Sequence, residues 1–240
     1  MRLGYPNPDT DIDAAEAIWL HALAVGFSPK YLADNADGIA IDWPRIPLPD
    51  DKALLDTSAD LGSALAGLLD TEAAVTGVTA GTVAEHLRIL GNISATNLKV
   101  TTGWGRKDKK GKVFPGREKT KTREWSGDES EALKKGFSTL GITEARGLEL
   151  LGRAVDVYLN DTTHWAAVPE AVWNYYIGGY QVIKKWLSYR EEAVLGRALT
   201  KDEAREVTAM VRRLTAIVLM TNDLDANYAT ARDNAYSWSA

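Results

Sequence analysis

A glycine pair inside an apolar, aromatic run constrains the fold of this chain more than any other feature of its sequence. The run extends from Val168 to Arg190 and reads VPEAVWNYYIGGYQVIKKWLSYR. Pro169 stands where a helix accepts its first residue, because the N–H that proline lacks would find no helical partner there. Gly178 and Gly179 then indicate either that another segment packs against bare backbone or that the chain bends.

Two helical pieces are predicted around the glycine pair. The first directs Val172, Trp173 and Tyr176 toward the protein, and the second begins at about Tyr180. Large side chains at helical spacing are expected to lie in the core, and here they are Trp173, Tyr176, Tyr180, Trp186 and Leu187. The polar residues between them are the better candidates for contact with DNA, because Asn and Gln can bond adenine and Arg and Lys can bond guanine or phosphate. These residues are Asn174, Gln181, Lys184, Lys185 and Arg190.

The second feature is a concentration of positive charge. Between Lys99 and Arg123, ten Lys or Arg residues stand against Asp108 and Glu118, which gives the segment a charge of +8. The rest of the chain has 18 basic and 31 acidic residues and therefore a charge of −13. A basic segment on an acidic body attracts nucleic acid locally, while the body discourages non-specific binding.

The basic segment from Gly103 to Gly127 is bracketed by Trp104 and Trp125. It is either a solvated loop or hairpin, or a hairpin that contacts DNA with Lys and Arg on phosphates. The tryptophans are equally suited to anchor the base of a hairpin. The candidate DNA-binding residues in this segment are Arg106, Lys107, Lys109, Lys110, Lys112, Arg117, Lys119, Lys121 and Arg123.

Helical periodicity and capping signals place most other elements. The expected helices are Asp9–Phe27, started by Asp11 or Asp13, then Lys52–Leu69, Thr82–Leu90, two short ones within Gly127–Leu151, and one long helix from Thr200 that includes Leu224. Capping boxes are predicted at Thr82 with Glu85 and at Thr200 with Glu203. Strands are expected at Ala154–Asn160 and within Asn97–Thr102 and Val113–Phe114.

The segment WPRIPLP at residues 43–49 is rich in proline and is expected to be extended and rigid. Arg45 within it either clamps a DNA phosphate or pairs with a nearby aspartate, and the ion pair is favoured. Small residues in the helix that follows, including Gly62, indicate close helix packing.

Several function classes are excluded by what the chain lacks. It has no cysteine, so disulfides, thiolate metal sites and thiol nucleophiles are absent. No apolar run is long enough to span a membrane, and the N-terminus does not read as a signal peptide, so a cytoplasmic protein is expected. The histidines His21, His86 and His164 are isolated, and no phosphate-binding loop or catalytic constellation is found. We therefore expect no metal, no cofactor and no enzymatic activity in this chain.

The run VPEAVWNYYIGGYQVIKKWLSYR, preceded by VYLNDTTHW and followed by RRLTAIVLM, closely resembles the C-terminal specificity region of single-chain restriction–modification enzymes of the type ISP family. DWPRIPLPDD at Asp42–Asp51, followed by LLDTSADLGSALAGLL, is similar to a second segment of the same region. The resemblance covers about Ala17 to Tyr228. It implies a DNA-reading region that works with an adenine-N6 methyltransferase domain, whose cofactor would be S-adenosylmethionine. That domain's glycine-rich cofactor loop and Asn/Asp-Pro-Pro-Tyr/Phe motif are missing from this sequence.

The sequence thus predicts an α+β protein, predominantly α-helical with a small β-sheet or hairpin. Its expected parts are residues 1–98 with the proline-rich segment, the basic segment 99–127, and residues 128–240 with the glycine pair, joined in one compact domain. The expected function is sequence-specific recognition of double-stranded DNA for a methyltransferase or translocase that is linked in cis or in trans. The alternative is a helical interaction module that docks on such a partner.

Overall fold

The computed structural model describes residues 10–93, 97–117 and 119–237. The chain is predominantly helical with a small antiparallel sheet, which confirms the α+β class. It divides into two compact units, one of Met1–Ala73 with Met220–Ala240 and one of Ala74–Leu219, and we call them unit 1 and unit 2. The three-part division by composition stays a prediction. None of the described helices is both long enough and apolar enough to cross a membrane.

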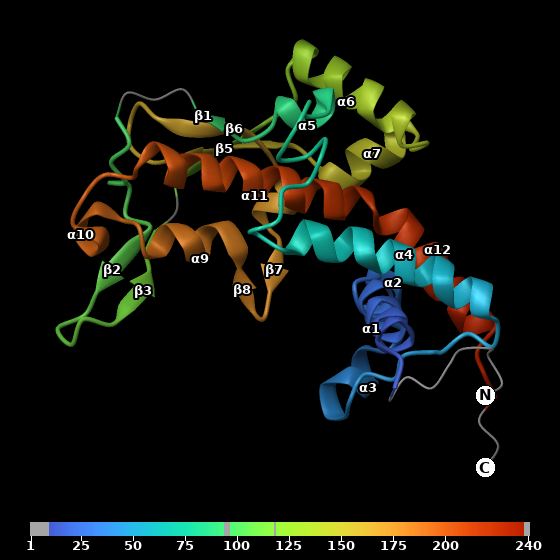
Figure 1. Ribbon diagram of the computed structural model, residues 1–240. Helices are drawn as coiled ribbons and strands as arrows, with labels where there is room; N and C mark the ends of the chain where they lie inside the picture. Colours follow the sequence, from blue (N-terminus) through green and yellow to red (C-terminus); the bar gives the residue numbers. More distant parts are fainter. Residues whose placement is uncertain (1–9, 94–96, 118, 238–240) are drawn as a thin grey trace. The chain divides into compact units, whose positions relative to one another are not determined.

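Unit 1 is a helical unit built from both ends of the chain (Figure 1). Its helices are α1 (Ile12–Gly26), α2 (Pro29–Asp34), α3 (Ala36–Ile41), α4 (Lys52–Leu69) and α12 (Thr221–Asp233). Asp11 caps α1 and Asp51 caps α4, since each carboxylate accepts main-chain N–H groups of the first helical turn. The two long helices predicted here are therefore confirmed.

Helices α1 and α4 pack closely through Gly62. A Cβ on Gly62 would collide with the main-chain carbonyl of Leu20, so only glycine permits this approach. The buried His21 joins the same region, with Nδ1 2.7 Å from the Ser58 hydroxyl and Nε2 2.9 Å from the Pro47 carbonyl oxygen. Burial holds the pKa of His21 below its ordinary value. His21 is thus a structural residue of unit 1.

The proline-rich segment has no helical structure and is fixed at its end. Pro49 bridges Ala235, and the N–H of Asp50 donates to the Asn234 carbonyl at 2.9 Å. Further along, Tyr31 of α2 packs edge-on against Tyr228 of α12, with ring centroids 5.3 Å apart. The C-terminal helix therefore completes the core of unit 1.

Unit 2 contains a four-stranded antiparallel sheet in the order β1-β6-β5-β4. The strands are β1 (Asn92–Ile93), β4 (Thr120–Arg123), β5 (Ala154–Tyr158) and β6 (His164–Pro169). Two separate hairpins are formed by β2 (Gly105–Lys107) with β3 (Val113–Pro115) and by β7 (Tyr176–Ile177) with β8 (Tyr180–Gln181). The strands predicted near Ala154 and Val113 are confirmed, whereas residues 97–102 form no strand.

The helices of unit 2 are α5 (Glu85–Arg88), α6 (Gly127–Thr139), α7 (Glu144–Leu151), α8 (Glu170–Trp173), α9 (Val182–Ser188), α10 (Glu192–Leu195) and α11 (Lys201–Leu219). Among them, α8 and α11 contact the four-stranded sheet. Helix α11 packs on β6, where the fully buried Trp165 donates its indole N–H to the Ala204 carbonyl at 3.1 Å. The capping box of Thr200 and Glu203 at its start is confirmed.

Three expectations about helices were wrong. The segment from Thr82 to Leu90 contains only the four-residue α5, whose N-cap is Ala84, so no capping box forms at Thr82. The long helix from Thr200 ends at Leu219, and Leu224 belongs to α12. Pro169 is the last residue of β6 and precedes α8 as its N-cap, because its ψ of 139° is extended.

Candidate nucleic-acid interface

The basic segment begins with the β2–β3 hairpin, which pairs Arg106 with Phe114 and Lys107 with Val113. Its tip is ordered by Asp108, whose carboxylate accepts the N–H groups of Lys110 at 2.8 Å and Lys112 at 2.9 Å. Gly111 supplies the positive φ of 80° that closes the loop. The one acidic residue of the hairpin therefore shapes the tip.

Basic side chains lie along the hairpin and directly after it. Arg106, Lys109, Lys110 and Arg117 are exposed, and no carboxylate of the described residues forms an ion pair with them. Lys112 lies over the ring of Phe114, with its Nζ 5.3 Å from the centroid. Lys107 donates to the Val194 carbonyl of α10 at 2.7 Å. The hairpin thus presents a cluster of charges that the described part of the protein leaves largely uncompensated.

The base of the hairpin is buried and held by hydrogen bonds. Trp104 is fully buried, donates its indole N–H to the Tyr158 carbonyl at 2.8 Å, and packs edge-on against Trp173. Trp125 likewise donates to the Gly152 carbonyl at 2.7 Å. Trp104 therefore anchors the base of the hairpin, as considered from the sequence, whereas Trp125 follows β4 and is bound to the chain just before β5.

Glu191, between α9 and α10, holds the same base. Its carboxylate accepts the N–H groups of Gly103 at 3.2 Å and Trp104 at 2.9 Å. Burial raises the pKa of Glu191 above its ordinary value, although the hydrogen bonds from this backbone act in the opposite direction. A Cβ on Gly105 would collide with the Ser188 carbonyl at the end of α9, so the hairpin lies directly against that helix.

The last part of the basic segment belongs to the central sheet. Arg123 of β4 donates to both carboxylate oxygens of Glu129, at 2.7 and 2.8 Å, and to Asp156 at 3.0 Å. The bonds to Glu129 hold the pKa of Arg123 above its ordinary value. Lys119 pairs with Asp161 at 2.6 Å, while Lys121 is exposed on β4. Arg123 is thus occupied within the fold, whereas Lys121 and the hairpin cations are accessible.

The glycine-pair stretch folds differently from expectation after α8. Gly178 and Gly179, with φ of 56° and 80°, form the two-residue turn of the β7–β8 hairpin, so the chain bends here. Tyr176 and Tyr180 are 61% and 57% exposed, and their prediction as core residues was wrong. A Gly-Gly pair between β-favouring residues is itself a hairpin signal, which the helical interpretation of this run overlooked.

The remaining candidates of this stretch lie in different environments. Asn174 is exposed after α8, and Gln181 donates its side-chain amide to the Trp173 carbonyl at 2.6 Å. Lys184 and Lys185 are partly exposed on α9. Arg190 stacks on Trp186, with its guanidinium carbon 3.8 Å from the ring centroid, and is partly buried. Helix α9 contacts β2, β3 and β8, so unit 2 brings the basic hairpin and Lys185 onto one helix.

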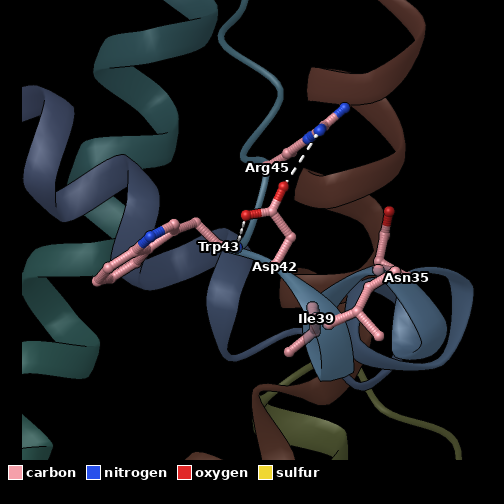
Figure 2. A pocket seen from close by; sticks show the side chains of 7 residues that line it. Asn35, Ile39, Asp42, Trp43 and Arg45 are labelled. Carbon is pink, nitrogen blue, oxygen red and sulfur yellow. Dashed lines mark hydrogen bonds and ion pairs between the residues drawn. The ribbon is translucent and has the colours of Figure 1, made fainter.

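In unit 1, Arg45 forms the aspartate pair favoured from the sequence. Figure 2 shows a pocket lined by Asn35, Ile39, Asp42, Trp43 and Arg45, in which the Arg45 guanidinium lies 3.3 Å from the Asp42 carboxylate. The N–H of Trp43 and the Arg45 side chain hold the pKa of Asp42 below its ordinary value. Both partners are exposed, so the pair contributes little to stability.

Within the described ranges, no group of three His, Asp or Glu side chains is arranged to hold a metal ion. A family model described as the Type ISP C-terminal specificity domain matches residues 13–217. The chain belongs to this family. The match includes the basic hairpin, the glycine-pair stretch and the proline-rich segment, whereas α12 lies beyond it. Comparisons with curated proteins and with solved structures gave no match.

Proposed function

We propose that this chain is the DNA-reading part of a restriction–modification or DNA methyltransferase system and that it binds double-stranded DNA through the β2–β3 hairpin. Membership of the type ISP specificity family supports target recognition. The observation that carries the DNA contact is the set of exposed cations Arg106, Lys109, Lys110 and Arg117, on and directly after a hairpin whose base is held by hydrogen bonds. A two-stranded ribbon of this kind fits the major groove of B-form DNA.

In this proposal the hairpin cations contact phosphates, and a smaller set of polar side chains discriminates between bases. The chain itself performs no catalysis. It positions a short asymmetric site for an adenine methyltransferase domain that binds S-adenosylmethionine, and it works in the cytoplasm together with that domain or with a translocase.

The test is selection from a pool of random-sequence duplexes at near-physiological salt, followed by sequencing of the bound fraction. A variant with Lys107, Lys109, Lys110 and Lys112 changed to Ala is compared with a control that changes Lys134, Lys135, Lys201 and Arg205 to Ala. Both variants lose four positive charges, and the control residues are exposed on α6 and α11, where ion pairs contribute little to stability.

We expect the wild-type chain and the control to enrich one short motif, and the hairpin variant to enrich the same motif with weaker recovery. If four hairpin cations each neutralise one phosphate, log K should fall against log[salt] with a slope of about −3.6 for the wild type. The slope should be markedly shallower for the hairpin variant, which keeps Arg106 and Arg117. Retention that does not depend on salt in the wild-type chain would contradict the proposal.

A second candidate function, docking on a methyltransferase or translocase, is favoured by a different observation. Unit 1 exposes Trp19, Ile41 and Trp43, each by more than 70%. Large exposed apolar side chains commonly mark protein contacts when they gather in a patch. Co-purification with such a partner by a chain that retains no DNA would favour docking alone.

A further inference from the structure

Three residues of unit 2 form an exposed cluster of one cation between two aromatic rings, and we call it the aromatic clasp. The Nζ of Lys185 lies 4.4 Å from the ring centroid of Tyr180 and 4.9 Å from that of Tyr189. Tyr180 is 57% exposed and Tyr189 is 45% exposed. The two rings therefore hold a lysine ammonium group at the protein surface.

The two rings lower the conformational freedom that Lys185 would lose on binding a ligand. A lysine side chain normally loses much conformational freedom when it binds, which weakens the contact it makes. Two rings that already hold the ammonium group remove part of this loss before any ligand arrives. Each ring also stays accessible on the protein surface, which is uncommon for tyrosines that serve only the core.

The turn beside the clasp is free of side chains. Gly178 and Gly179 form the tip of the β7–β8 hairpin, and a Cβ on either would meet no other atom within 4 Å. Tyr180 of the clasp follows this turn directly and pairs with Ile177. A surface without Cβ atoms lets another backbone come close.

The clasp is continuous with the basic hairpin through α9. Lys185 lies on α9, and this helix contacts β8 at its start and both β2 and β3. In Figure 1 the two hairpins extend below α9, one at each end of the helix. Positive charge on the basic hairpin and on Lys185 of α9 fits a polyanion that extends along this helix.

We propose that the aromatic clasp and the Gly178–Gly179 turn form a second contact on the DNA backbone, with Lys185 bound to a phosphate and the turn lying against the sugar-phosphate chain. Tyr180 and Tyr189 are positioning residues, because they act through Lys185. The inference rests on the proposed function and adds to it a site outside the basic hairpin.

The first experiment measures the affinity of the full chain for a labelled mixed-sequence duplex over a range of salt concentrations. Lys185→Ala should weaken binding about tenfold at low salt, as expected for loss of one charge-assisted hydrogen bond. It should also reduce the steepness of the salt dependence by about 0.9, the value for one phosphate. Lys135→Ala on α6 is the matched control and should bind as the wild type does.

The second experiment separates positioning from direct contact. A Tyr180→Ala, Tyr189→Ala double variant should weaken binding about threefold to tenfold, because Lys185 must then be ordered on binding. Its salt slope should stay unchanged, since the charge remains. The corresponding double Phe variant keeps both rings and should bind as the wild type does, whereas a weak Phe variant would mean that the phenol groups contact DNA and would overturn the positioning role.

The third experiment tests the turn. Asn is well accepted at the first central position of a turn with two positive φ values, so Gly178→Asn should keep the hairpin and add a side chain at its tip. We expect weaker DNA binding with unchanged thermal unfolding. Gly141→Asn, which has a φ of 68° and open space around it after α6, is the matched control. Wild-type affinity in Gly178→Asn would overturn the close approach of the turn.

The two proposals fail in different ways. If the wild-type chain shows no salt-sensitive binding at all, the proposed function fails. If the wild type binds and the basic-hairpin variant loses affinity while every clasp variant binds normally, only the second contact is overturned.

Discussion

At the scale of single residues, carboxylates position much of the described backbone. Asp108 shapes the tip of the basic hairpin, Glu191 holds its base, and Asp51 and Asp11 begin helices. At the start of α11, Glu203 both caps the helix and binds a neighbouring arginine side chain. It accepts the N–H of Thr200 at 2.8 Å and two hydrogen bonds from Arg197, at 2.7 and 3.0 Å.

The Glu203 cap predicts a pH dependence of stability. The Arg197 hydrogen bonds lower the pKa of Glu203 from 4.5 to about 2. Because this pKa is lower in the folded chain, the ionised group stabilises the fold above 4.5, and the stabilisation is lost as pH falls toward about 2. Glu203→Gln keeps a capping acceptor but loses the charge.

We expect Glu203→Gln to unfold at a lower urea concentration than the wild type at neutral pH, and the difference to vanish as the pH approaches about 2. Asp202→Asn, in the same helical turn but 91% exposed, is the control and should change the midpoint much less. A difference for Glu203→Gln that grows on acidification would contradict this assignment.

At the scale of elements, glycines mark where helices touch and where they do not. Gly62 of α4 meets the main chain of Leu20, whereas Gly67 of the same helix has open space around its missing Cβ. Gly62→Ala should therefore destabilise the protein by about 2 kcal/mol through overpacking. Gly67→Ala should stabilise it by about 1 kcal/mol through helix propensity. Denaturant unfolding of both variants measures the contrast, and equal effects of the two would show that α1 does not constrain Gly62.

Helices and strands that depend on local signals were predicted from the sequence, whereas the surroundings of individual side chains were not. Local signals that need only a few neighbouring residues predicted α1, α4, β5 and the capping box at Thr200. The environment of Tyr176 and Tyr180 could not be derived from helical spacing, because a Gly-Gly turn reverses the chain and brings both rings to the surface. Likewise, only the pairing of β4 with β5 brings the Arg123 side chain to the Asp156 carboxylate, whereas the hairpin cations remain accessible.

At the scale of the whole molecule, the chain returns at its C-terminal end to complete the unit with which it begins. Asp225 of α12 accepts hydrogen bonds from the Ser28 hydroxyl at 2.6 Å and the Lys30 N–H at 2.9 Å, and Tyr228 packs on Tyr31. The matched family region ends at residue 217, before this helix. The stability of unit 1 should therefore depend on a segment outside that region.

A chain truncated after Leu219 tests this dependence by hydrogen exchange. We expect amides of α1, α2 and α4 to lose protection, because the core around Tyr31 is left open, and amides of the β5–β6 pair to keep it. A truncation two residues before the end, after Trp238, is the control. Undiminished protection in α1 and α2 after the longer truncation would show that α12 is dispensable.

The anchored base of the β2–β3 hairpin separates two tasks along one short segment. Trp104, Gly105 and Glu191 attach the hairpin to the rest of unit 2, whereas residues 108–111 make their ordering bonds among themselves and with Lys112. The tip can consequently be replaced by loops of other length and charge while the residues that attach the hairpin stay the same. A new loop can therefore be engineered at the tip of the hairpin while the rest of the fold is kept.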